Sequence, residues 1–310
     1  MNKNGKTCRS SLLLFLTACI WGLAFVSQSK GMEVMQPFTF NGVRCLLGAA
    51  VLFPPVCLQV YAGKRKRESE GKKGSGISWK VTLSGGLFCG IVFTAASSFQ
   101  QVGIAGTTVG KAGFITALYI IFVPLLGIFL KKKVPKIVYF GAAMAVVGMY
   151  LLCMTERFRL ARGDVLVLVC AVLFAVHILV IDHYSPKTEG VILSFMQLFV
   201  CGVICTAMAF LFESPSLSQL KSGLAPILYA GIMSCGVAYT LQISGQKGMN
   251  PTVASLILSL ESVVAALAGF LAFKMGFLKT DQTLTFRQVL GCVIVFAAVV
   301  LVQLPIGKKE

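Results

Sequence analysis

The amino-acid sequence predicts an all-α, polytopic integral membrane protein with ten transmembrane helices, built as two inverted five-helix repeats. Hydrophobic residues make up 56% of the 310 residues and charged residues only 13%, whereas charged residues are about a quarter of a soluble domain. The hydrophobic residues form continuous runs of about twenty, the length of a helix that crosses a bilayer. These runs lack the alternation of apolar and polar residues that barrel strands require.

Ten apolar runs follow one another along the chain, and each predicts one membrane-spanning helix. Their approximate bounds are 10–28, 37–61, 80–101, 105–130, 135–154, 164–182, 190–212, 223–245, 250–273 and 287–305. Lipid offers no hydrogen-bond partners, so a helix is the one element that satisfies the backbone within each run. The spacing of Gly86 and Gly90 predicts a close approach between helices.

Basic residues lie at the ends of the apolar runs, although the net charge of +17 is large. A nucleic-acid reader would carry such residues on a solvated face, interleaved with aromatics, so nucleic acid is excluded as a partner. The positive-inside rule predicts cytoplasmic N- and C-termini. The segment 61–79 is rich in Lys, Arg, Gly and Ser and is predicted to be a basic cytoplasmic loop on the lipid surface.

The second half of the chain resembles the first, which predicts repeats over residues 1–155 and 156–310. Aligned pairs at an offset of 142 residues include Gln100 with Gln242, Leu118 with Leu260 and Tyr119 with Glu261. Aligned pairs at an offset of 153 residues include Trp21 with Phe174 and Arg44 with Gln197. Because each half has five helices, an odd number, the halves are expected to have opposite orientation, as in many secondary transporters.

The order and duplication of these motifs resemble the drug/metabolite transporter superfamily, and specifically the EamA-type ten-helix carriers. The resemblance rests on LTACIWGLAFVSQ in the first run, on GTTVGKAGFITALYIIFVPLLG in the fourth and on NPTVASLILSLESVVAALAGFLAF in the ninth. It implies a plasma-membrane carrier, often an exporter, for amino acids, related metabolites or drugs, working by alternating access. The family commonly has Glu-Pro where this chain has Glu261-Ser262, so a helix kink there is expected to be absent or displaced.

Ionisable residues deep in apolar helices are the leading candidates for function, since they are costly there and usually face a bundle interior or a water-filled cavity. Glu261 lies about 16 Å into its helix, near the midplane, and Arg44 and Lys111 lie about 10 Å deep. We expect Arg44 and Lys111 to attract a carboxylate, and Glu261 to bind an ammonium group or carry a coupling proton. The alternative is a structural ion pair in which Glu261 neutralises Lys111 or Arg44.

Other polar and aromatic residues at similar depth complete the candidate site. His177 could relay protons near neutral pH, and the alternative is a hydrogen-bonded packing residue. Tyr119, Gln197 and Trp21 are expected to form walls of an aqueous cavity, together with Tyr239, Gln100 and Gln242.

No metal or cofactor is expected. Nearly all of the eleven cysteines lie in apolar runs without CxxC or Cys/His spacing, which predicts small apolar packing residues. GTTVGKA departs from the phosphate-binding loop at Ala105 and Ala112, so ATP-driven transport by this chain is excluded.

Together these observations predict a secondary transporter and not an enzyme. Its partners are a small-molecule substrate and the lipid bilayer, with a coupling proton and a homo-oligomer left open. Two alternatives stand beside it: a membrane-embedded enzyme acting on a lipid-linked substrate, and a non-transporting membrane subunit.

Overall fold

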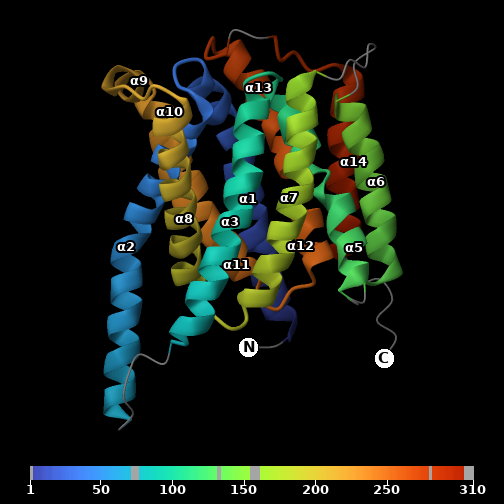
Figure 1. The fold of residues 1–310 in the computed structure, drawn as a ribbon. Helices are drawn as coiled ribbons and strands as arrows, with labels where there is room; N and C mark the ends of the chain where they lie inside the picture. Colours follow the sequence, from blue (N-terminus) through green and yellow to red (C-terminus); the bar gives the residue numbers. More distant parts are fainter. Residues whose placement is uncertain (1–2, 71–76, 131–133, 154–160, 279–280, 304–310) are drawn as a thin grey trace.

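The protein is a helical bundle in a computed structural model that describes residues 3–70, 77–130, 134–153, 161–278 and 281–303 (Figure 1). Within these ranges the elements are helices and no strand is present. The prediction of an all-α protein is therefore confirmed for the described residues.

The helices follow the apolar runs of the sequence closely. In the first half they are α1 (Lys3–Met32), α2 (Pro37–Ser69), α3 (Trp79–Ile104), α4 (Val109–Ala117), α5 (Tyr119–Phe129) and α6 (Lys136–Cys153). In the second half they are α7 (Arg162–Tyr184), α8 (Gly190–Phe212), α9 (Leu217–Ser222), α10 (Leu224–Leu228), the π-helix η1 (Tyr229–Ala238), α11 (Tyr239–Gln246), α12 (Pro251–Leu258), α13 (Glu261–Lys274) and α14 (Phe286–Gln303).

Eight helical segments in the described part of the chain are long and apolar enough to cross a membrane, so the protein is a multi-pass membrane protein. Three of these segments join consecutive elements: α4 with α5, α10 with η1 and α11, and α12 with α13. The apolar helices α6 and α14 are shorter, at 18 residues each, or about 27 Å.

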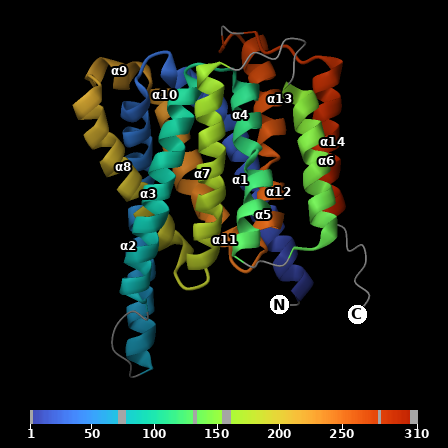
Figure 2. The same ribbon diagram turned by 45° about the vertical axis from the view of Figure 1, so that its right-hand side comes forward.

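Successive apolar segments run in alternating directions between two ends of the bundle (Figures 1 and 2). The lower end is the one at which α1 begins, and the upper end is the one at which α1 finishes at Met32. Helix α7, the first of the second half, begins at the upper end and therefore runs opposite to α1.

The two interrupted segments lie in the interior of the bundle. In the most apolar stretch of α12–α13 67% of the residues are buried, and in that of α4–α5 61%, compared with 28% for α2. Helices α6 and α14 pack together at one edge in both views, and α2 and α8 pack together near the opposite edge (Figures 1 and 2). The interior position of α4–α5 and α12–α13 places their side chains where a pocket can form.

Small residues allow the close contact between α3 and α8. A Cβ atom at Gly86 would clash with Met196 of α8, and one at Gly90 would clash with Val200. The glycine spacing thus brings these two helices together as the sequence predicts, because a missing side chain lets the backbones approach.

The predicted loop at 61–79 is corrected in part, since α2 continues as a helix to Ser69. Lys64 to Glu68 are good helix formers, and Lys64 Nζ lies 3.8 Å from Glu68 Oε1 one turn later. With 33 residues the helix is about 50 Å long, and it projects beyond the lower end of the bundle (Figure 1). The remaining part of the predicted loop, at 71–76, lies outside the described residues.

Glu213 at the end of α8 caps the beginning of α2. Its carboxylate accepts hydrogen bonds from the backbone nitrogen of Phe38 at 2.8 Å and from both the backbone nitrogen and the hydroxyl of Thr39 at 2.7 Å. The first N–H groups of a helix have no partner within it, and a negative charge there also interacts favourably with the helix dipole. The contact fastens the two halves of the chain together at the upper end.

We predict that Glu213→Ala lowers the free energy of unfolding by about 1–2 kcal/mol, because it removes these hydrogen bonds to the start of α2. The quantity to measure is the thermal or denaturant unfolding of the purified protein in detergent. Glu33→Ala serves as the control, since Glu33 pairs with Lys30 on the surface and such pairs contribute about 1 kcal/mol or less. Equal effects of the two substitutions would contradict the cap.

Candidate functional site

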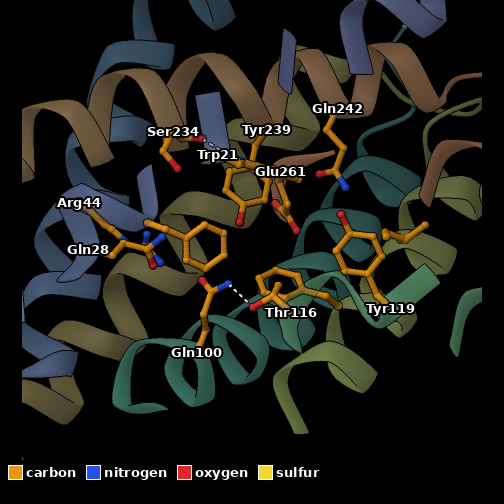
Figure 3. Close-up of a pocket in the computed structure, with 13 residues that line it drawn as sticks. Trp21, Gln28, Arg44, Gln100, Thr116, Tyr119, Ser234, Tyr239, Gln242 and Glu261 are labelled. Atoms are coloured by element: carbon orange, nitrogen blue, oxygen red, sulfur yellow. Dashed lines mark hydrogen bonds between the residues drawn. The ribbon is translucent and has the colours of Figure 1, made fainter. Parts of the chain in front are cut away.

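A buried pocket lies within the bundle, and both halves of the chain supply its walls (Figure 3). Its lining residues are Trp21, Phe25, Gln28, Arg44, Gln100, Thr116, Tyr119, Phe174, Ile178, Ser234, Tyr239, Gln242 and Glu261. The cavity leaves about 30 Å³ for the centres of water molecules, which is room for about two of them. In this conformation the pocket is too small for a metabolite.

Two interrupted helices place Tyr119 and Glu261 at the pocket. Between α4 and α5 the backbone tightens at Leu118, whose N–H bonds to the carbonyl of Ile115 at 3.2 Å. Between α12 and α13 the same tightening occurs at Leu260, whose N–H bonds to the carbonyl of Ile257 at 3.2 Å. Leu118 and Leu260 are equivalent positions of the repeat at the offset of 142, so both halves are interrupted at the same point.

A series of serines accounts for the interruption before Glu261. The hydroxyls of Ser255, Ser259 and Ser262 each bond to the backbone carbonyl three residues earlier, at 2.7–2.9 Å. Such bonds compete with the helical backbone pattern and bend helices. The helix is thus interrupted at Ser259–Leu260, directly before the carboxyl group of Glu261.

The π-helix η1 supplies a third irregular wall. Ser234 lies within it, and Tyr239 follows directly after it at the start of α11. A π-helix is rare and is frequently found at functional sites. Hydropathy did not predict the ten residues of η1, because an α-helix and a π-helix have the same apolar composition.

Arg44 and Glu261 carry opposite charges in the same pocket but do not form an ion pair. Arg44 is 2% exposed and Glu261 is 3% exposed. Arg44 Nε donates to Asn41 Oδ1 at 2.8 Å, and its guanidinium lies 5.7 Å from the ring centre of Phe40. Among the described residues neither charge has an oppositely charged partner within 4.0 Å. The alternative of a structural ion pair between them is therefore not seen among the described residues.

Several oxygens around the pocket also lack hydrogen-bond partners in the described part of the chain. They are Gln28 Oε1, Tyr119 Oη, Gln242 Oε1 and Glu261 Oε1. Figure 3 shows the side chains of Tyr119 and Glu261 pointing into the same pocket. Buried polar atoms without partners cost free energy, so a ligand or water that supplied hydrogen bonds would be stabilised here.

Aromatic rings form the other wall of the pocket. The rings of Trp21 and Tyr239 lie 4.7 Å apart, and those of Tyr239 and Phe93 lie 4.6 Å apart. Trp21 Nε1 donates to the carbonyl of Ser234 at 3.3 Å, which fixes the indole against η1. The prediction that Trp21 and Tyr119 line a cavity agrees with this placement.

His177 and Gln197 lie behind this wall and do not line the pocket. His177 Nε2 is 3.0 Å from Gln197 Oε1, and both side chains are fully buried. The imidazole also contacts the ring of Phe93 at 5.5 Å and that of Tyr239 at 6.2 Å. The geometry is that of a hydrogen-bonded packing histidine which supports the aromatic wall.

Lys111 forms an ion pair with a residue that the sequence analysis did not consider as a partner. Its Nζ lies 2.5 Å from Asp164 Oδ2, at the start of α7. Asp164 is fully buried and also accepts hydrogen bonds from Thr107 Oγ1 at 2.7 Å and from the backbone nitrogen of Ala161 at 2.8 Å. The alternative in which Glu261 neutralises Lys111 is not seen, because the contact between α4 and α7 brings Asp164 beside Lys111 instead.

A second cavity hollows the lower end of the bundle. It measures about 510 Å³ and is lined by residues from α1, α2, α8 and α11, including the charged side chains of Arg9, Glu189 and Lys247. Gln59 of α2 donates to Glu189 at 2.9 Å on its rim. The lower end is therefore open and polar, whereas acidic contacts fasten the upper end.

Several lining residues were missed by the sequence analysis. Three of them are polar residues within apolar runs, and this polarity could have identified them: Gln28, Thr116 and Ser234. Phe25 and Ile178 carry no such signal, yet they are equivalent at the offset of 153. Four repeat-related pairs line the pocket: Trp21 with Phe174, Phe25 with Ile178, Gln100 with Gln242, and Tyr119 with Glu261.

Comparison with known proteins finds relatives along nearly the whole chain. The model of the EamA-like transporter family matches residues 9–154 and again residues 161–304. An uncharacterized transporter of Archaeoglobus fulgidus is 30% identical over 300 residues, which cover 96% of this chain and 87% of the relative. The protein PecM of Dickeya dadantii is 25% identical over 298 residues, which cover 93% of this chain and 90% of PecM.

A solved crystal structure shares the fold. It aligns with a TM-score of 0.68 at 19% sequence identity, over 94% of this chain and 96% of the other.

We predict that Lys111→Met and Asp164→Asn each destabilise the protein by about 1.5–3 kcal/mol, because each removes the charged hydrogen bond between Lys111 and the fully buried carboxylate of Asp164. The double variant is expected to cost less than the sum of the two, and a double-mutant cycle on unfolding in detergent measures the difference. Additive costs would contradict a structural pair. If Lys111→Met leaves the stability unchanged but abolishes the binding of anionic solutes, Lys111 is a substrate-binding residue and not a structural one.

Proposed function

The chain belongs to the EamA-like transporter family, and from this premise we propose that it is a secondary transporter of small metabolites such as amino acids or drugs. It works by alternating access between two inverted five-helix repeats, in the direction of export. The observation that carries the proposal is the pocket in which Arg44 and Glu261 remain unpaired between the halves. The relatives named as transporters support a carrier over an enzyme acting on a lipid-linked substrate.

The symmetry of the pocket supports the inverted repeats. Residues at equivalent repeat positions face one cavity, and the two central helices are interrupted at equivalent leucines, Leu118 and Leu260. Helices α1 and α7 run in opposite directions (Figure 2). In this proposal α6 and α14 complete each repeat as its fifth membrane-spanning helix, and substrate binds where the halves meet.

The small volume of the pocket supports a moving carrier over an open channel. A cavity of about 30 Å³ admits water but no metabolite, so a solute enters only when helices separate. Interrupted helices suit this motion, since their free backbone groups are tolerated in a membrane where they line a cavity.

The charges of the pocket define the solutes that it would accept. The guanidinium of Arg44 suits a carboxylate or another anionic group. Glu261 suits a substrate ammonium, or it carries a coupling proton when no cation is bound. The aromatic wall of Trp21 and Tyr239 would cover the apolar part of the solute, and together these features fit an amino acid or a similar zwitterion.

The distribution of basic residues supports a plasma-membrane orientation with both termini cytoplasmic. Lys64, Lys66 and Arg67 lie on the part of α2 that projects from the lower end, the end at which α1 begins. Basic residues next to a membrane helix favour the cytoplasmic side, where anionic lipids attract them. In this proposal the lower end faces the cytoplasm.

We predict that Glu261→Gln abolishes counterflow of radiolabelled amino acids in proteoliposomes, or makes it insensitive to pH. The substitution retains the shape of the side chain but removes its charge and its exchangeable proton. Counterflow is measured at one acidic and one alkaline pH for the native and the variant protein. Glu189→Gln is the matched control, because Glu189 lies on the surface at the lower end. Unchanged counterflow in Glu261→Gln would reduce Glu261 to a structural polar group.

We predict that Arg44→Gln weakens binding of carboxylate-bearing solutes about ten- to a hundredfold, the effect of losing a charged hydrogen bond of about 1.5–3 kcal/mol. Glutamine is the residue at the equivalent position, Gln197, and so fits the repeat. Competition by amino acids is compared with competition by amines that lack the carboxylate, with Arg287→Gln as a control outside the pocket. Equal weakening for both solute types would show that Arg44 does not recognise the anionic group.

A further inference from the structure

Four cysteines from three helices meet in one buried cluster beside the pocket. Cys45 belongs to α2, Cys201 and Cys205 to α8, and Cys235 to η1, and all four are fully buried. The sulfur atoms of Cys45 and Cys201 are 3.5 Å apart, and those of Cys201 and Cys205 are 3.9 Å apart. Cys235 contacts Cys45 from the other side. The sequence analysis treated these residues as separate packing positions, and the fold brings them together.

A chain of hydrogen bonds links the cluster to the pocket. Arg44 donates to Asn41, and Asn41 Nδ2 donates to the hydroxyl of Ser97 at 3.1 Å. The hydroxyl of Ser97 lies 3.6 Å from the sulfur of Cys201. Ser97 is thus a polar neighbour of Cys201 within the hydrophobic core that holds the four thiols. Arg44, directly before Cys45 in the chain, is a cation that has no acidic partner within the described residues. A nearby cation stabilises a thiolate, which is the reactive form of cysteine.

The geometry favours a sulfur–sulfur reaction over metal binding. No group of three His, Cys, Asp or Glu side chains in the described ranges is arranged to hold a metal ion. Cys45 and Cys201, by contrast, lie between helices that are already close. A Cβ atom at Gly42 would clash with Thr206 of α8, and one at Gly202 would clash with Leu46 of α2. A disulfide needs the two sulfurs to approach by about 1.5 Å more.

We propose that Cys45 and Cys201 form a dithiol that hydrogen peroxide oxidises to a disulfide, which joins the two halves of the chain. The thiolate of one cysteine attacks the peroxide oxygen, breaks the O–O bond and becomes a sulfenic acid, while hydroxide leaves and takes up a proton as water. The second thiol attacks the sulfenic sulfur, forms the S–S bond and releases a second water. A small thiol reductant reverses the change by thiol–disulfide exchange.

Two features favour Cys45 and Cys201 as the reacting pair: the short distance between their sulfur atoms and their position on different helices. Cys201 and Cys205 lie one turn apart on the same helix, so a bond between them would join no two elements. A bond between Cys45 and Cys201 would fix α2 against α8, and these helices belong to different halves. If the halves move against each other, as the proposed function requires, this bond would hold them in one conformation.

The chemical part of the proposal is tested on the purified full chain treated with hydrogen peroxide, alkylated and digested without reductant. Cys8 and Cys57 are exposed and are replaced by serine in every protein tested. We expect a mass loss of about 2 Da, the two thiol hydrogens, and a linked peptide pair that contains Cys45 and Cys201. Recovery of a different pair, of sulfinic acids or of unchanged thiols would overturn the assignment. This outcome does not depend on any transport activity.

The variants Cys45→Ser and Cys201→Ser are expected to lose the linked peptide, as are the corresponding alanine variants if serine impairs folding. Cys89→Ser and Cys170→Ser are the matched controls, because both thiols are fully buried outside the cluster. Loss of the link in these controls would contradict the pairing.

The mechanical part rests on the proposed function and is tested by amino-acid counterflow before peroxide, after peroxide and after reductant. We expect peroxide to abolish counterflow, reductant to restore it, and Cys45→Ser to be resistant to peroxide. If the disulfide forms without changing counterflow, the claim that it holds the two halves in one conformation is contradicted, whereas the claim that Cys45 and Cys201 are oxidised to a disulfide is not. If the native protein shows no counterflow before oxidation, the proposed transport function is contradicted. The linked peptide would still support the disulfide between Cys45 and Cys201.

Discussion

The lack of hydrogen-bond partners in lipid is the constraint on which this structure depends. Each backbone group that crosses the bilayer must be satisfied inside the protein, so the chain forms helices wherever it meets lipid. The exceptions, at Leu118, at Ser259–Leu260 and in η1, lie in the interior, where side-chain hydroxyls and tightened turns satisfy the backbone. The pocket forms where these irregular segments meet, because a regular helix would have left no space between the packed side chains.

Hydropathy predicted the fold well because the same constraint governs the sequence and the structure. The bounds of α7 and α8 differ from their apolar runs by only a few residues. Local composition did not predict where α2 ends. The basic residues after Tyr61 were expected to form a loop, but they continue α2 through Gly63, because Lys64 to Glu68 are good helix formers.

The candidate site was predictable in part, for an equally physical reason. Depth along a helix drew attention to Arg44 and Glu261, since charges are rarely buried in membrane helices without cause, and both residues line the pocket. The hydrogen-bond and ion-pair partners of a residue depend on tertiary contacts, which its depth along the helix does not reveal. Lys111 therefore pairs with Asp164 at the start of α7, and His177 bonds to Gln197 behind the pocket. The repeat offset proved more informative than any single motif, because it relates residues that face each other across one cavity.

The two acidic contacts at the upper end act together as a latch. Glu213 holds the start of α2, and Asp164 holds Lys111, and in each case the carboxylate belongs to one half and its partner to the other. A carrier that opens at this end must release both contacts in the same movement. Screening by salt weakens the interaction of the partly exposed Glu213 carboxylate with the start of α2. In the proposed transport cycle, the ionic strength of the medium on that side would thus influence how readily this end opens, independently of the solute carried.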